Sequence, residues 1–184
     1  GDVDERILAL NALAEVGDPN ALVLFSTEFN DEHAPIAVRS AAASALASCG
    51  NAAILELNNA LATEHSSLKT SVAAALGKIG DASLPAVMDS LAKLDSEEGA
   101  LIALNQLPAW KEAGRLREYV KRRVESSLRF EDMRLAIHHL ENERIQLLAD
   151  SLQSRARHDG IFALKALSLL NDRETISIAI ENLN

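Results

Sequence analysis

The sequence contains few of the residues that break helices, cross-link a chain or supply aromatic rings. Four prolines and eight glycines among 184 residues, together with abundant alanine and leucine, favour helices over sheets. Aromatic residues make up only 3% of the chain, which argues against sugar sites and single-stranded nucleic-acid sites built from stacked rings. The single cysteine excludes an internal disulfide framework and fits a reducing compartment. We therefore expect a cytoplasmic protein, or the cytoplasmic side of a membrane protein.

Positive charge and long apolar runs are also scarce. Lysine and arginine number 18 against 27 acidic residues, and the net charge of −9 repels a phosphate backbone, so we expect no nucleic-acid partner. No run approaches the about 20 consecutive apolar residues that a transmembrane helix needs, so no membrane span is expected. The sequence opens on Gly1 and lacks a basic and then apolar leader, which predicts an excised piece of a longer protein with a tag remnant.

One short pattern recurs along the chain. A basic residue is followed by small or apolar residues three, six, seven and ten positions later, and then by a glycine. The clearest copy comprises Arg39, Ala42, Ala45, Leu46, Cys49 and Gly50. Other copies begin at Arg6 and Lys69, and weaker ones at Glu97 and Gly160, which replace the basic residue. The first four starts are about thirty residues apart, and the interval from 97 to 160 leaves room for one degenerate unit.

These offsets place the apolar residues on successive turns along one face of a helix. Gly17, Gly50 and Gly80 then fit the left-handed residue that ends a helix. Polar residues that could cap the following helix come next: Asp18, Asn51, Asp81 and Asp172. The second helix has its own apolar stripe, such as Ile54, Leu57 and Leu61. The unit is therefore helix, tight turn, helix, and stacking of units buries the apolar area that one pair leaves exposed.

The pattern R-x-x-A-x-x-A-L-x-x-h-G-D resembles the HEAT repeats, in particular the short bacterial type first described in phycobilin lyases. It covers residues 4–94 well, degenerates over 95–110 and recovers over 160–184. The resemblance implies an all-α, right-handed α-α superhelix, a HEAT-like α-solenoid of about five to six helical hairpins. We expect one continuous solenoid with three regular repeats in 1–94. The remainder, 95–184, would hold degenerate repeats, a basic helix (110–128) and a final repeat (160–184).

The resemblance also assigns roles to the faces of the array. In HEAT repeats the first helix of each pair lines the convex side and the second the concave side, where protein partners bind. The exposed second-helix positions would then form a partner-binding ridge: Glu56, Asn59, Thr63, Asp89 and Lys93. Four residues resemble the family's acid and base ladder between neighbouring units: Asp18, Arg39, Lys69 and Asp81. Glu97 and Gly160 depart from that ladder.

The segment from Trp110 to Glu141 breaks the repeat pattern. Between positions 110 and 129, seven basic residues stand against three acidic ones, and apolar residues recur every four positions from Leu116 to Leu128. This pattern predicts an amphipathic basic helix. Its charged side is either the solvated face of a packed helix or a patch that binds an acidic partner or an anionic membrane surface. The patch would comprise Arg115, Lys121, Arg122 and Arg123.

The sequence contains no convincing catalytic or metal-binding group. Cys49 occupies an apolar slot of the repeat and is expected to be a buried, inert thiol. His138 and His139 are adjacent, so they point to different faces of a helix and lack the spacing of metal ligands. His158 with Asp159 is interpreted as a turn or a helix start. The repeated His-Glu dyads of deoxyhypusine hydroxylase, a HEAT-type iron enzyme, are absent. We therefore expect no enzyme activity, no cofactor and no metal.

Three functions are compatible with these features. The leading one is a non-catalytic protein-protein interaction scaffold, or a regulatory HEAT-repeat domain of a larger protein. The C-terminal part resembles the HEAT segment of bacterial ATP/ADP-translocase-like carriers, which implies a soluble auxiliary domain in contact with a membrane-bound partner. The third is a phycobilin lyase or its chaperone-like subunit. Because the sequence stops at Asn184 within an expected helix, we also predict further repeats or self-association through the open C-terminal end.

Overall fold

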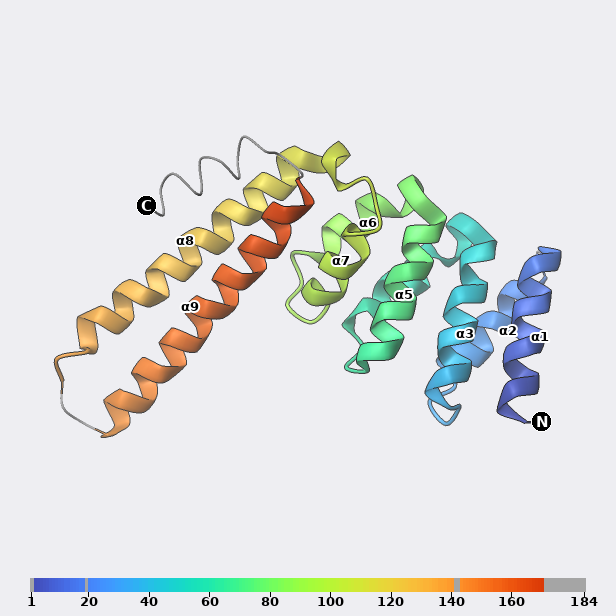
Figure 1. Ribbon diagram of the computed structural model, residues 1–184, viewed down its shortest axis with the longest axis horizontal. Coiled ribbons are helices and arrows are strands. Elements are labelled where there is room, and N and C mark those ends of the chain that lie inside the picture. The colour runs from blue at the N-terminus through green and yellow to red at the C-terminus, as the bar shows by residue number, and fades with distance from the viewer. Residues whose placement is uncertain (1, 19, 141–142, 171–184) are drawn as a thin grey trace. The chain divides into compact units, whose positions relative to one another are not determined.

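A computed structural model of the protein describes residues 2–18, 20–140 and 143–170, and every regular element in these ranges is helical (Figure 1). The predicted all-α class is therefore confirmed. The chain divides into two compact units, residues 1–109 and residues 110–184. The predicted continuity of one solenoid through both units stays a prediction.

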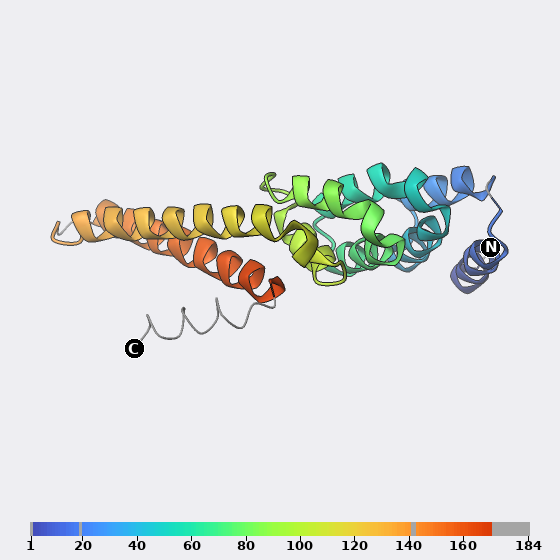
Figure 2. The same cartoon turned by 90° about the horizontal axis from the view of Figure 1, so that it is seen from above.

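The first unit consists of helices that alternate between two layers. Its α-helices are α1 (Val3–Val16), α2 (Ala21–Asn30), α3 (Ile36–Leu46), α4 (Ile54–Asn59), α5 (Ser66–Ile79), α6 (Leu84–Ser90) and α7 (Glu97–Leu104). Short 3-10 turns connect several of them: η1 (Ala47–Ala53), η2 (Ala60–Ala62) and η3 (Gly80–Ser83). Helices α1, α3, α5 and α7 lie side by side in sequence order (Figure 1). Seen from above, α2, α4 and α6 form the second row (Figure 2).

The recurring pattern supplies the core of this unit, as its spacing predicted. Its inward positions are fully or nearly fully buried in three copies: Ala42, Ala45, Leu46, Val72, Ala75, Leu76, Ala100, Ala103 and Leu104. Alanine at these positions lets neighbouring helices approach closely. In the first copy, Ala9, Ala12 and Val16 are exposed instead, because α1 packs on one side only, against α2 and α3.

The glycines that end the first helices all have positive φ, as predicted, but not one common conformation. Gly17 is left-handed helical at φ 70° and ψ 31°. Gly50 and Gly80 have ψ of −132° and −145°, a region essentially restricted to glycine. At both positions a 3-10 turn then leads directly into the second helix, so α4 and α6 begin without a side-chain cap. The N-cap residues of these two helices are Ala53 and Ser83 rather than Asn51 and Asp81.

The second unit is a long helical hairpin. After the turn η4 (Ala109–Glu112), α8 spans Ala113–Ile137 and α9 spans Glu143–Leu169, and the two pack side by side (Figure 1). The predicted basic helix is thus part of α8. The predicted turn at His158 and Asp159 is wrong, because α9 continues through both residues and through Gly160. The final repeat predicted for 160–184, its cap Asp172 and the predicted open end fall largely on residues 171–184, outside the described residues.

A substitution at Gly160 tests the continuity of α9. An added Cβ would meet Ser127 Oγ at 3.6 Å, an ordinary van der Waals distance. Because glycine inside a helix is less favourable than alanine, Gly160→Ala should raise the free energy of unfolding of residues 110–184 by about 0.5–1 kcal/mol. Urea unfolding followed by fluorescence measures this unit, since the single Trp110 and the single Tyr119 both belong to it.

The control for this substitution is Gly114→Ala, in the first turn of α8, where an added Cβ has no neighbour within 4 Å. Its effect should be small and favourable. A loss of stability for Gly160→Ala alone would mean that the helix is interrupted at that position.

Candidate functional site

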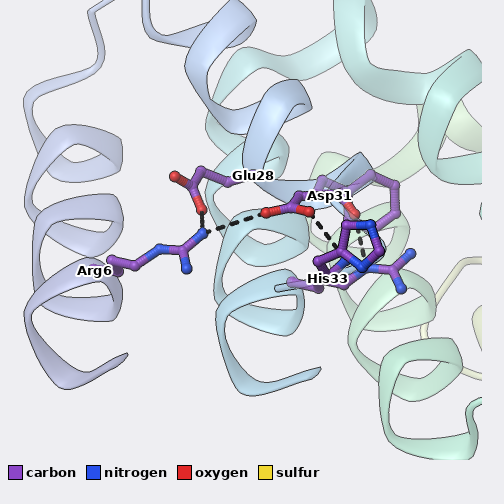
Figure 3. Close-up of polar contacts among 6 residues, drawn as sticks. Arg6, Glu28, Asp31 and His33 are labelled. Atoms are coloured by element: carbon purple, nitrogen blue, oxygen red, sulfur yellow. Dashed lines mark hydrogen bonds and ion pairs between the residues drawn. The ribbon is translucent and has the colours of Figure 1, made fainter. Parts of the chain in front are cut away.

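A cluster of charged side chains joins α1 to the end of α2 (Figure 3). Arg6 on α1 forms an ion pair with Glu28 on α2, and its Nη2 lies 3.9 Å from Asp31 Oδ2. The backbone N–H of His33 donates a hydrogen bond of 3.0 Å to Asp31 Oδ1. The side chains of Arg6 and Glu28 are only 31% and 23% exposed, so their pairing holds the first hairpin together.

The predicted ladder residues make contacts of several kinds. Lys69 Nζ on α5 pairs with Glu98 Oε2 on α7 at 2.6 Å and so joins two first-layer helices. Arg39 Nε on α3 donates to the carbonyl oxygen of Phe29 on α2 at 2.9 Å. Asp18 Oδ1 accepts the backbone N–H of Asn20 at 2.8 Å, just before α2. Asp81 is exposed in η3. The ladder itself stays a prediction, and Glu98 is a partner that the sequence pattern did not indicate.

Hydrogen bonds also join the second helices to one another. Ser26 Oγ and Asn30 Nδ2 on α2 donate to the carboxylate of Glu56 on α4, at 2.6 and 2.5 Å. Ser90 is the last residue of α6, and its buried hydroxyl Oγ donates a hydrogen bond of 3.1 Å to Asn58 Oδ1 on α4. Helices α2, α4 and α6 therefore form one continuous surface. Glu56, predicted to face a partner, is half-buried and holds α2 against α4.

An exposed band follows this surface. Phe25, Leu57 and Val87 are the buried anchors of α2, α4 and α6. On each helix, the residue two positions before the buried anchor and the residue two positions after it are exposed. These two residues are four positions apart, so they lie on the same face of the helix. We call them the second-helix band: Val23, Thr27, Leu55, Asn59, Pro85 and Asp89.

The band contains part of the predicted ridge and adds residues that sequence reasoning missed. Asn59 and Asp89 belong to it, Lys93 is exposed just beyond α6, and Thr63 is half-buried after η2. Val23 and Leu55, to which the sequence pattern assigned no role, are 73% and 72% exposed. Val23 and Leu55 each lie two residues before the buried anchor of their helix. This shared position is the sequence signal that could have identified them as exposed apolar residues.

The predicted basic patch is divided by the hairpin. Arg115, Lys121 and Arg122 are exposed on α8. Arg123 instead pairs with Asp159 on α9, with Nη1 2.5 Å from Oδ1, and the two side chains are 21% and 5% exposed. Arg123 therefore joins the two helices, while the other three residues of the patch face solvent.

Among the residues that the structure describes, no group of three or more His, Cys, Asp or Glu side chains could hold a metal ion. Cys49 is half-buried rather than buried, because it lies in η1, after α3 has ended. Within the described ranges, no helix has the length and apolar character required to cross a bilayer.

Comparison with known proteins supports the interpretation of the first unit. A family model described as HEAT repeats matches residues 24–105, from within α2 to the end of α7. No curated protein matches the chain. HEAT repeats stack helical pairs into α-solenoids, generally serve as protein-interaction scaffolds and are typically non-catalytic. The number of hairpins and the hand of the superhelix stay predictions. The matched helices α3 to α7 show the alternating layers and the repeated core that such an array requires, so residues 24–105 of this chain are HEAT repeats.

Proposed function

We propose that residues 1–109 bind a protein partner along the second-helix band. The observation that carries this proposal is the exposure of Val23 and Leu55, 73% and 72%, at equivalent positions of neighbouring second helices. Burial of a valine or leucine side chain contributes about 1.5–3 kcal/mol, so covering both would favour binding substantially. HEAT repeats generally use their extended surface in this way.

The chemistry of the band favours an amphipathic ligand. Val23, Leu55 and Pro85 give apolar contacts, while Thr27, Asn59 and Asp89 lie one helical turn further along and supply hydrogen-bonding groups. Packed helices are about 8–10 Å apart, so the apolar positions should repeat at that interval. A partner helix crossing the band advances about 10 Å in seven residues. We therefore expect a partner segment with apolar residues seven positions apart.

Site-specific photocrosslinking tests this proposal. A photoreactive amino acid would replace Leu55 or Asn59 in the protein expressed in its source cells. We expect each to yield the same covalent adduct with one partner. Matched controls at Ser44 and Ala74, which are exposed on α3 and α5 in the other layer, should not yield it. Adducts of equal yield from both layers, or none from the band, would contradict the proposal.

A charge substitution gives a second measurement. Leu55→Glu should abolish the adduct formed at Asn59 while leaving the helical circular dichroism unchanged, because Leu55 is exposed. Glu56 is unsuitable for this purpose, since its substitution would also remove the hydrogen bonds from Ser26 and Asn30 that join α4 to α2. An adduct that persists in the Leu55→Glu variant would place the partner elsewhere.

A further inference from the structure

Exposed apolar side chains form a stripe along α8. Val124, Leu128 and Leu135 are all exposed. Leu128 and Leu135 follow Val124 by four and eleven positions, and Glu131 follows it by seven. These intervals place the four side chains on one face of the helix. The stripe therefore holds one acidic residue among three apolar ones.

Helix α9 has a matching stripe across a hollow. Ile161 and Leu164 follow Arg157 by four and seven positions, so these three side chains also share one helix face. Together with Leu128 and Glu131 of α8, they line a groove of about 420 Å³. Leu128, Ile161 and Leu164 are 60%, 51% and 66% exposed. Apolar side chains gathered in this way along one hollow favour a covering element.

Small residues make the floor of this groove. Ser127 Oγ donates a hydrogen bond of 2.8 Å to the carbonyl oxygen of Ala156, so its hydroxyl is satisfied by the neighbouring helix. Gly160 lies opposite the same serine, since a Cβ added to it would be 3.6 Å from Ser127 Oγ. The floor therefore stays low, and its contacts fix the register of α8 against α9.

The two stripes present the same order of chemistry along the hairpin. Because the helices run in opposite directions, the level of Leu128 on α8 corresponds to that of Ile161 on α9, one residue beyond the contact between Ser127 and Gly160. One turn further along the hairpin, both stripes become charged, with Glu131 on α8 and Arg157 on α9. Apolar and charged levels therefore coincide on the two edges of the groove.

The two charged edges have opposite signs. Glu131 accepts hydrogen bonds of 3.0 and 2.6 Å from Nε and Nη2 of Arg134, and these hold the pKa of the Glu131 carboxyl below its usual value. The positive charge of Arg157 across the groove also lowers this pKa. The α8 edge therefore carries an ionised carboxylate, while the α9 edge carries a guanidinium that is exposed to solvent.

We propose that this groove binds the same groove of a second copy of the chain, in a dimer whose two-fold axis runs along the groove. A rotation of 180° about that axis places α8 of each copy over α9 of the other, at the same level. Leu128 then meets Ile161 of the other copy, and Glu131 meets Arg157 of the other copy. Symmetry repeats both contacts, so apolar side chains face apolar ones and each acid faces a base.

The size of the hairpin face suits such a dimer. Helices α8 and α9 have 25 and 27 residues, which makes them about 38 and 40 Å long. Each helix is about 10 Å across, so the face that they form together measures about 750 Å². Stable interfaces bury about 800 Å² on each partner. Two hairpins packed through these faces form a four-helix bundle, which buries an apolar stripe of every helix.

A second copy is favoured because it supplies both complements without any further assumption. A different ligand would need apolar groups at one level and paired charges of the correct sign at the next. This proposal concerns residues 110–170 and is independent of the partner proposed for residues 1–109.

Formation of a mixed disulfide in the full chain tests the arrangement. Two variants in a Cys49→Ser background, Leu128→Cys and Ile161→Cys, are mixed and left to exchange subunits before mild oxidation. We expect the mixture to form a disulfide between the two variants at least tenfold faster than either variant forms one with itself, because position 128 of one copy lies over position 161 of the other. Faster self-coupling of Leu128→Cys would place two α8 helices face to face and overturn the proposed axis. Equal rates, or no disulfide in the mixture, would overturn the dimer.

Sedimentation gives a readout that does not depend on cysteine geometry. The unchanged protein should sediment as a dimer at the concentration used for the oxidation. Leu164→Asp should weaken dimerisation at least tenfold with the helical circular dichroism retained, because Leu164 is exposed. The control is Met133→Asp, an exposed position on the opposite side of α8 from Glu131 and Leu135, and it should leave the dimer intact. A monomeric unchanged protein, or equal weakening by both variants, would contradict the proposal.

Discussion

Arg123→Met should lower the free energy of unfolding of residues 110–184 by about 3–5 kcal/mol, because it leaves the buried carboxylate of Asp159 without its cationic partner. The guanidinium Nη1 lies 2.5 Å from Asp159 Oδ1, and the Asp159 side chain is only 5% exposed. The same guanidinium lies 5.7 and 6.0 Å from the ring centroids of Tyr119 and Phe162, so its removal also weakens packing between the two helices. Urea unfolding followed by the fluorescence of Trp110 and Tyr119 measures this unit selectively.

Two further variants separate loss of the pair from a general effect of losing a charge. Arg122→Met removes the neighbouring exposed arginine and should change stability by less than about 0.5 kcal/mol. The double variant Arg123→Met/Asp159→Leu replaces the pair by apolar groups and should recover most of the loss, as replacement of buried ion pairs often does. A loss below about 1 kcal/mol for the single variant would show that water reaches Asp159 and solvates it.

The sequence could not predict this ion pair, because the two residues are far apart in the chain and no local pattern links them. Asp159 precedes a glycine and follows a histidine, a combination typical of turns, so a turn or helix start was the natural interpretation. Its burial depends on Arg123, which is 36 residues earlier in the chain and on the opposite helix. Only the packing of α8 on α9 brings the two groups together.

Local periodicity, by contrast, predicted the first unit well. The positions of Ala42, Leu46 and Leu76 follow from a 3.6-residue period that each helix expresses by itself, and all three are buried. The positive φ of Gly50 and Gly80 follows from the need to reverse the chain within a few residues. The ψ angles of these glycines and the 3-10 turns beside them could not be predicted in the same way. Both depend on how closely the second helix of a pair packs against the first.

The candidate surface was only partly accessible to sequence reasoning for a related reason. Helical spacing correctly placed Asn59 and Asp89 among the exposed positions of the second helices. Glu56 shares that spacing, but Ser26 and Asn30 of the preceding hairpin hold it in place, and a contact between repeats is invisible to a pattern within one repeat. Leu55 lies outside the apolar stripe of Ile54, Leu57 and Leu61, so the pattern within one helix gave no reason to assign it a role.

The hairpin of α8 and α9 shows that the spacing of a repeat does not by itself predict the length of its helices. A step of about thirty residues suits the first unit, whose helices are 6 to 14 residues long. Helices α8 and α9 have 25 and 27 residues, so the same interval of sequence is one long helix rather than a pair of short ones. The copy of the pattern at Gly160 still marks an inward face, since Ala163 and Ala166 are buried, although no turn precedes it.

Gly99→Ala should lower the free energy of unfolding of residues 1–109 by about 2–3 kcal/mol, because α7 passes too close to η2 for a methyl group. A Cβ at Gly99 would lie 2.5 Å from the carbonyl oxygen of Leu61 and 2.9 Å from its Cβ. Leu61 is fully buried, so neither backbone nor side chain can yield without moving a helix. The gain of about 1 kcal/mol that alanine gives inside a helix is smaller than this strain.

The consequence of that clash should extend to the contact between α5 and α7. Displacement of α7 should break the ion pair between Glu98 Oε2 on α7 and Lys69 Nζ on α5, which are 2.6 Å apart. Amide hydrogen exchange should therefore accelerate in α5 and in α7. Gly114→Ala, which meets no neighbour within 4 Å, is the matched control and should leave exchange in α5 and α7 unchanged. If Gly99→Ala left both stability and exchange at the level of the unchanged protein, α7 would have to sit further from Leu61 than the structure places it. The close approach of successive hairpins, on which the continuity of the second-helix band depends, would then need revision at this point.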